Sequence, residues 1–269
     1  MEINGKTWQK TADSLPQSAH GIRYGLSVSG EKNLNGNHFA HLEVGGNGVH
    51  YWDNQEYNEQ TIKLSAGYKF QNSRYAWRVT PFAEQNWLGG SRYNRVIGTN
   101  VSYSHRFNNN FRLMLSSGQY WKTYHDEHIA SRYNSRTPHF QTTLFHTVSP
   151  RWLSYVGTGW NHELAEETEQ SSIRKSVHLG TIKTFPNGLG MRANLSYARR
   201  TFDAPGSLVY HFNRKDHEYQ INTSLWHHKF TWHGFMPQLN VRYQKINSNM
   251  SGFYSRKNLQ WFISVEKQL

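Results

Sequence analysis

The sequence contains no cysteine among its 269 residues. This excludes a disulfide framework, a thiol nucleophile and a cysteine-based zinc site. Apolar residues make up only 36% of the chain, below the roughly 45–50% of an ordinary globular domain. No stretch approaches the run of about 18 apolar residues that a transmembrane helix needs, and residues 1–8 lack the apolar core of a secretory signal. So little apolar material would leave a conventional core poorly filled.

Aromatic residues, in contrast, are abundant: 10 Trp, 16 Tyr and 14 Phe make up 15% of the chain. A disordered chain would not carry so many rings, so they must lie on a surface that accommodates them. Lys and Arg number 30 against 18 Asp and Glu, a net charge of +12. Taken alone, this excess suggests a polyanionic partner such as nucleic acid.

Apolar and polar residues alternate with a period of two along most of the chain. In residues 234–244, the apolar positions are Phe235, Pro237, Leu239, Val241 and Tyr243, and the intervening polar positions are Gln238, Asn240, Arg242 and Gln244. Successive strand residues point to opposite faces, so this pattern predicts a strand with one apolar and one polar side. About thirteen such segments follow Gly21, with a weaker one at Ile3–Gln9. No stretch has a convincing helical period.

The long, two-faced strands favour an all-β fold, a transmembrane antiparallel up-and-down barrel, over a soluble β-sandwich. In such a barrel, apolar side chains face lipid and polar ones face a wet lumen, which accounts for the low apolar content. Short links (71–73, 108–110, 149–150 and 186–188) alternate with longer ones (88–91, 124–138, 164–171, 202–215 and 248–253). Bacterial barrels have an even strand number with short periplasmic turns. We therefore expect about fourteen strands, the first at Ile3–Gln9, and both termini in the periplasm.

The charged residues on the polar positions are predicted to line the lumen. They are Lys63, Arg78, Glu84, Arg112, Arg174, Arg192, Glu218, Arg242 and Glu266. Such residues form ladders that stiffen the wall, and an excess of cations biases a pore toward anions. Cations in the predicted loops are expected to face lipopolysaccharide phosphates instead of nucleic acid: Arg132, Arg136, Arg199, Arg200, Arg214 and Lys215.

Aromatic residues cluster at the ends of the predicted strands. The tryptophans there are Trp52, Trp77, Trp87, Trp121, Trp152, Trp160, Trp226, Trp232 and Trp261. Because Trp and Tyr favour the boundary between lipid and water, we expect them to form girdles and not a ligand site.

No residue pattern indicates catalysis. The chain has no Gly-x-Ser-x-Gly elbow, and its many Ser and His make chance combinations inevitable. His125 and His128 are spaced so that they could share a metal, as are His227, His228 and His233, but both groups are interpreted as solvated link residues. We therefore expect no catalytic residue, no metal site and no cofactor.

Several segments together resemble the C-terminal barrel of the surface lipoprotein assembly modulator (Slam) family. The residues that carry the likeness in the predicted strand near Pro81 are Pro81, Glu84, Trp87, Gly89 and Gly90, and those in the final hairpin are Gly234, Phe235, Pro237, Ser248, Asn249, Tyr254 and Arg256. The segments at Leu26–Ser29 and Arg214–Asp216 are similar too. The likeness spans nearly the whole chain in the correct order.

The resemblance implies an outer-membrane translocon barrel that moves surface lipoproteins, or soluble haem- or iron-acquisition proteins, to the cell surface. Its expected partners are a client protein, outer-membrane lipids and lipopolysaccharide, with periplasmic chaperones and the barrel-insertion machinery as further candidates. Family members carry a periplasmic domain of helical repeats, so residues 1–269 are expected to be the single barrel domain. A porin-like passive channel with an anion bias remains the alternative, and an adhesin or receptor is a third class.

Overall fold

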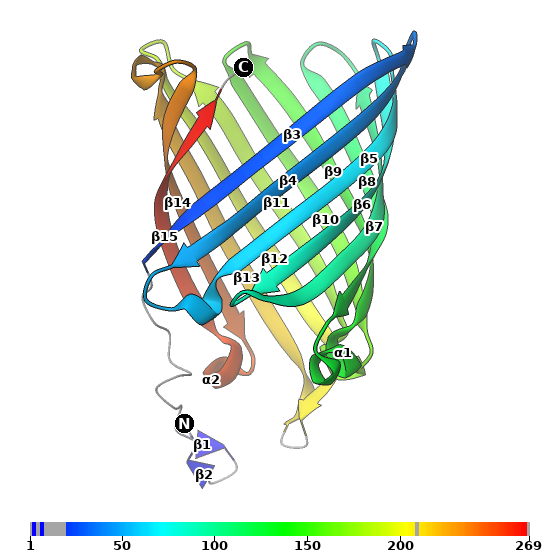
Figure 1. The fold of residues 1–269 in the computed structure, drawn as a ribbon, viewed down its shortest axis with the longest axis vertical. Helices are drawn as coiled ribbons and strands as arrows, with labels where there is room; N and C mark the ends of the chain where they lie inside the picture. The colour runs from blue at the N-terminus through cyan, green and yellow to red at the C-terminus, as the bar shows by residue number, and fades with distance from the viewer. Residues whose placement is uncertain (1, 4–5, 8–19, 208–209, 268–269) are drawn as a thin grey trace.

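Thirteen antiparallel strands form one sheet in the computed structural model, which describes residues 2–3, 6–7, 20–207 and 210–267. The strands are β3 (Gly21–Asn35), β4 (His38–Tyr51), β5 (Glu59–Gln71), β6 (Tyr75–Leu88), β7 (Ser91–Arg106), β8 (Phe111–Tyr124), β9 (Ser135–Ser149), β10 (Trp152–Ala165), β11 (Ser172–Thr184), β12 (Leu189–Ser207), β13 (Tyr210–His227), β14 (Phe235–Ser248) and β15 (Arg256–Lys267). Each strand pairs with its neighbour in sequence. The sheet curls around a central axis into a barrel shape (Figure 1), and the expected all-β, up-and-down class is confirmed.

The expected fourteenth strand is not part of this sheet. Of the segment Ile3–Gln9, the described residues Ile3, Lys6 and Thr7 belong to a small separate hairpin of β1 (Glu2–Ile3) and β2 (Lys6–Thr7). The rest of that segment lies outside the described residues. Because thirteen is odd, β3 begins at one end of the barrel and β15 finishes at the other (Figure 1).

The two edge strands, β3 and β15, meet without a ladder of backbone hydrogen bonds in the described part of the chain. In an antiparallel sheet of odd strand number the first and last strands run parallel, so the regular antiparallel pairing cannot continue between them. The guanidinium of Arg23 lies 5.7 Å from the ring centroid of Phe262 and links the two edges. Leu26 and Trp261, on these edges, are 76% and 74% exposed, against 43% for Leu195 in the middle of the sheet.

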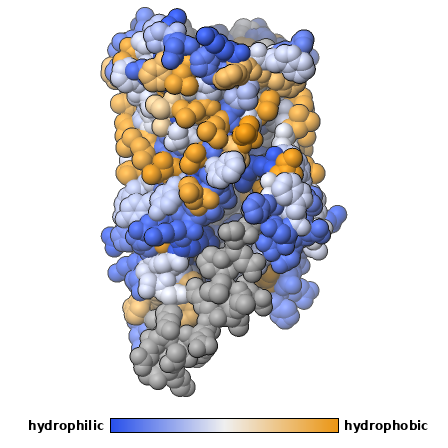
Figure 2. Space-filling view, turned by 90° about the vertical axis from the view of Figure 1, so that its left-hand side faces the viewer, coloured by the Kyte–Doolittle hydropathy of each residue, from blue (hydrophilic) through white to orange (hydrophobic). Residues whose placement is uncertain are grey.

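The outer face of the sheet is apolar around the middle of the barrel. Exposed aliphatic side chains such as Leu64, Val156, Leu179 and Val241 point outward. On the face drawn in Figure 2, hydrophobic surface gathers in the central zone, with hydrophilic surface beyond it. The alternate residues of each strand therefore face inward, as period-two patterning requires.

Most of the tryptophans expected in girdles are exposed, and one faces inward. The exposed ones are Trp52, Trp77, Trp121, Trp152, Trp160, Trp232 and Trp261. Trp226 is the correction: it pairs with Gly190 and Gln238 on the inner side of the sheet. A Cβ on Gly190 would come within 2.0 Å of the Trp226 ring, so the missing side chain gives the indole room on the inner wall.

The links differ partly from those expected. The link predicted at 88–91 is a two-residue turn, Gly89–Gly90, whose positive φ angles of 56° and 81° suit glycine. The loop predicted at 202–215 is mostly strand, since β12 continues to Ser207 and β13 begins at Tyr210. The long links also contain helical turns: η2 (Gln55–Tyr57), α1 (Glu127–Tyr133), η3 (Thr168–Gln170) and α2 (Ser251–Tyr254), while η4 (His228–Phe230) precedes β14. Among the described helices, none has the length and apolar character to span a membrane.

We predict that Leu195→Arg on the outer face destabilises the barrel in lipid by about 2–4 kcal/mol, because it brings a charge into the apolar band. Met114→Arg is the matched control, since Met114 lies in β8 opposite Ser104 and Thr143 on the inner face. Urea titration in lipid vesicles, followed by the folded and unfolded bands on a gel, measures both. Equal losses for the two variants would contradict the assignment of faces.

Candidate functional site

A ladder of alternating charges crosses the inner wall near the end with the longer links. Lys122 Nζ lies 2.9 Å from Glu163 Oε1, and the other Glu163 oxygen lies 3.5 Å from Arg200 Nη1. Arg200 Nε in turn lies 3.0 Å from Glu218 Oε1. Arg174 Nε completes the ladder, 2.8 Å from Glu218 Oε2. We call these five residues the charge ladder.

The strand register explains how the charge ladder assembles. Its residues come from β8, β10, β11, β12 and β13, where Arg174 stands opposite Arg200 and Glu163 stands opposite Ser172. The side chains are 21–28% exposed. Single ion pairs with this access to water contribute only about 0–1 kcal/mol each. Each pair taken singly therefore contributes little to stability, and the two carboxylates, which each contact two cations, join the five residues into one linked set.

Two smaller ion-pair clusters lie elsewhere in the barrel. Glu31 Oε1 accepts from Lys69 Nζ at 2.7 Å, and its Oε2 lies 3.8 Å from Arg78 Nη2, which ties β3 to β5 and β6. Near the long-link end, Arg214 contacts the buried Asp216 through its Nε at 3.0 Å and its Nη2 at 2.5 Å.

The predicted lumen residues all alternate with the apolar outer residues, and their contacts vary. Arg174 and Glu218 meet in the charge ladder, and Arg78 approaches Glu31. Three of the cations lie over aromatic rings: Lys63 over Phe82 (5.4 Å to the centroid), Arg112 over Phe145 (4.8 Å) and Arg192 over Trp226 (5.9 Å). Arg242 Nε donates a hydrogen bond to Asn222 Oδ1 at 3.2 Å. Glu84 Oε1 accepts one from Asn86 Nδ2 at 3.0 Å. Glu266 stands opposite Met236.

Sequence reasoning missed Lys122 and Glu163, and it placed Arg200 and Arg214 in a loop facing lipopolysaccharide. Instead Arg200 and Arg214 face inward, because β12 and β13 extend farther than predicted and strand alternation governs their side chains. The sequence signal that could have identified them is the alternation of inward and outward residues, which continues along β12 beyond residue 201. Of the other predicted loop cations, Arg199 and Lys215 are exposed and alternate with these inward residues.

The family-like residues of the final hairpin hold the long-link end together. The side chain of Asn249 accepts from the backbone N–H of Lys215 at 2.8 Å and donates to the carbonyl of Asn213 at 3.0 Å. The ring of Tyr254 lies 3.6 Å from the Arg214 guanidinium carbon. Ser248 donates its N–H to Ser255 Oγ at 2.9 Å. These contacts dock the β14–β15 link onto β13.

In the remaining family-like segments, Pro81 and Trp87 share the outward register of β6, while Glu84 lies on the inner side. Gly234, with a φ of 80°, precedes Phe235 at the start of β14. Pro237 lies opposite Val265, and Arg256 opens β15.

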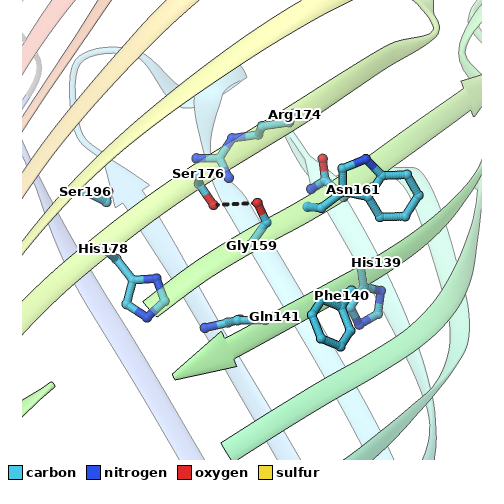
Figure 3. Close-up of a pocket in the computed structure, with 10 residues that line it drawn as sticks. His139, Phe140, Gln141, Gly159, Asn161, Arg174, Ser176, His178 and Ser196 are labelled. Atoms are coloured by element: carbon cyan, nitrogen blue, oxygen red, sulfur yellow. Dashed lines mark hydrogen bonds between the residues drawn. The ribbon is translucent and has the colours of Figure 1, made fainter. Parts of the chain in front are cut away.

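A hollow in the inner wall lies beside Arg174 of the charge ladder (Figure 3). Its polar lining includes His139, Asn161, Ser176 and His178. Ser176 Oγ donates to the carbonyl of Gly159 at 3.4 Å, and a Cβ on Gly159 would come within 2.8 Å of that hydroxyl. Among the described residues no cluster of three His, Asp or Glu side chains has metal-binding geometry. The hollow offers hydrogen-bond donors and acceptors to whatever occupies the interior.

Outside the strands, an ion pair joins α1 to the β10–β11 link. Arg132 Nε donates to Glu167 Oε2 at 2.8 Å, and this bond raises the pKa of the Arg132 guanidinium. The backbone N–H of Glu167 also donates to the Arg132 carbonyl at 3.2 Å. Arg132, predicted to face lipopolysaccharide, is thus engaged with a neighbouring link.

We predict that Glu218→Gln destabilises the barrel by on the order of 1–2 kcal/mol, because Arg174 and Arg200 lose their shared carboxylate. Glu43→Gln is the control: it removes the same charge from the inner register of β4, where no described residue forms an ion pair with it. The urea midpoint in detergent micelles measures both. A midpoint for Glu218→Gln equal to that of the control would show that the ladder contributes nothing to stability.

The profile of the family described as surface lipoprotein assembly modifier matches residues 1–269. The chain is 26% identical over 258 residues to the surface lipoprotein assembly modifier of Pasteurella multocida (strain Pm70), covering 89% of this chain and 50% of that protein. It is 27% identical to surface lipoprotein assembly modifier 1 of Haemophilus influenzae (strain ATCC 51907 / DSM 11121 / KW20 / Rd), and the match covers 98% of this chain and 54% of that protein. A hemophilin secretion modulator of Acinetobacter baumannii is 23% identical to the chain, and the match covers 89% of this chain and 48% of that protein.

The chain thus spans about half the length of the curated relatives it matches. Among solved structures, a KdgM porin aligns with a TM-score of 0.41 and 10% identity, covering 92% of this chain and 99% of that chain. Because the family profile extends from the first residue to the last, this chain belongs to the surface lipoprotein assembly modifier family.

Proposed function

We propose that this chain is an outer-membrane translocon barrel that moves surface lipoproteins, or related soluble haem- or iron-acquisition proteins, to the cell surface. The names of its relatives support this role: several are surface lipoprotein assembly modifiers, and one is a hemophilin secretion modulator. The client is taken to be a polypeptide, and the barrel works by shape and charge without making or breaking bonds.

The observation that carries the proposal is the polar inner wall with its charge ladder. Asn, Gln, Ser and Thr side chains there offer hydrogen bonds to an unfolded or extended polypeptide, which carries a donor and an acceptor on nearly every residue. The ladder charges are already paired with one another. A wall of paired charges binds a passing chain weakly, and weak binding is what conduction requires.

The proposal also covers placement in the membrane. The apolar outer band would lie in the hydrocarbon of the outer membrane, and the short-turn end, where β15 finishes, would face the periplasm. Residues 1–269 would form one barrel domain, and the part present only in the longer relatives would act on the periplasmic side. Chaperones and the barrel-insertion machinery would meet the protein there.

The test is a reconstitution. Proteoliposomes containing this chain, joined to the remaining part of the Haemophilus influenzae relative, are loaded with that relative's cognate client and then treated with external protease. We expect the client to become protease-sensitive while a marker protein trapped in the same vesicles stays protected. Vesicles prepared with heat-unfolded barrel are the control. A client that stays as protected as the marker in both preparations would overturn the translocon role.

The second candidate is a porin-like passive channel with an anion bias and no protein client. It is favoured by the cation excess on the inner wall, where the charge ladder holds three cations and two carboxylates. Planar-bilayer recording distinguishes the two candidates. A translocon should give a small or flickering current that an added client interrupts, whereas a steady anion-selective current indifferent to the client would favour the porin.

A further inference from the structure

Five neighbouring strands each carry one outward cation near the long-link end of the barrel. They are Lys175 on β11, Arg199 on β12, Lys215 on β13, Lys245 on β14 and Lys257 on β15. Lys245 is half-buried and the other four are exposed. We call these residues the outer cation row.

The register of the outer cation row brings like charges together. Lys175 stands directly opposite Arg199, and Lys245 directly opposite Lys257. Directly opposed like charges on neighbouring strands destabilise a sheet. No ion pair of the described residues includes any of the five cations. An anion from outside the chain would therefore relieve the repulsion between these cations.

The outer cation row lies at the edge of the apolar band. Lys175 pairs with Trp160 on β10, and the next outward residues toward the middle of the barrel are Val177 on β11 and Tyr197 on β12. Tyr197 and Tyr219 stand opposite each other, and Tyr219 pairs with Lys245. Aromatic residues of this kind mark the boundary between hydrocarbon and headgroups. The cations thus reach headgroup depth.

The opposite end of the same wall is different. Lys183, the outward cation near the end of β11, lies 4.3 Å from the ring centroid of Trp152 and 5.1 Å from that of Phe185. Its charge is thus engaged with two aromatic rings of this chain. The cations of the outer cation row thus differ from Lys183, because no aromatic ring of the described residues lies under their charges.

We infer that the outer cation row binds the phosphate groups of lipid A, the anionic glycolipid anchor of lipopolysaccharide, in the outer leaflet. Five neighbouring strands about 4.8 Å apart span roughly 19 Å across the wall. Lys215 and Lys245 are also offset by four residues along their strands, so the cations spread over an area that matches a headgroup with several phosphates better than a single ion. The inference rests on the proposed outer-membrane placement and assigns the long-link end to the outer leaflet.

The test measures binding of fluorescent lipid A to the folded chain in detergent micelles. Lys175→Gln with Arg199→Gln, and separately Lys245→Gln with Lys257→Gln, should each weaken binding by about tenfold or more, because each cation near an anionic lipid surface contributes appreciably to binding. The matched control, Lys183→Gln with Arg151→Gln, removes two charges at the other end. It should change binding less than about twofold, because these charges are far from the lipid phosphates and the attraction falls off with distance. Lys245→Arg with Lys257→Arg should bind like the parent chain.

Two further arms identify the ligand chemistry and need no variant. Dephosphorylated lipid A should bind at least about tenfold more weakly than lipid A. Inorganic phosphate at equal phosphate concentration should not displace lipid A, because several phosphates linked in one molecule bind more tightly than single phosphate ions. Equal binding of dephosphorylated lipid A, or equal loss in the control at the other end, would overturn the assignment. Because the readout is lipid binding, failure here leaves the transport proposal standing, and a failed client assay leaves this one standing.

Discussion

The structure depends on the pairing of backbone N–H and C=O groups between neighbouring strands. In a bilayer no water satisfies these groups, so a spanning sheet must continue its ladder from strand to strand. Here the ladder runs unbroken in sequence order from β3 to β15. Once each backbone is committed to it, side chains can point only outward or inward, and the two faces acquire separate chemistry.

That separation decides where each charge is located. Arg199 and Arg200 are adjacent in sequence, yet Arg199 is exposed on the outer face and Arg200 joins Glu163 and Glu218 on the inner one. The inner charges of the charge ladder pair with one another, and other inner cations, such as Arg112 and Arg192, lie over aromatic rings. The five cations of the outer cation row form no ion pair with the described residues. The net charge of +12 is therefore divided between the two faces, as partly paired cations on the inner wall and a row of cations on the outer edge.

The weakest place in the barrel is where the backbone hydrogen-bond ladder is interrupted. Between β3 and β15 the described residues form no ladder of backbone hydrogen bonds, and Arg23 contacts the ring of Phe262 across the two edges. The high exposure of Leu26 and Trp261 reflects the missing neighbour on one side. An edge of this kind presents unpaired backbone groups that an added strand could use.

The sequence alone determined the alternation, and with it the all-β class, the outward apolar residues and the inner position of Arg174 and Glu218, because strand geometry acts between adjacent residues. It did not determine the strand number, the space beside Gly190 that accommodates the Trp226 ring, or the contact of Glu163 with Arg200. Those depend on register between strands, which places Gly190 beside Trp226 and Glu163 within reach of Arg200. Register is a relation between segments distant in sequence, so only the tertiary structure could decide it.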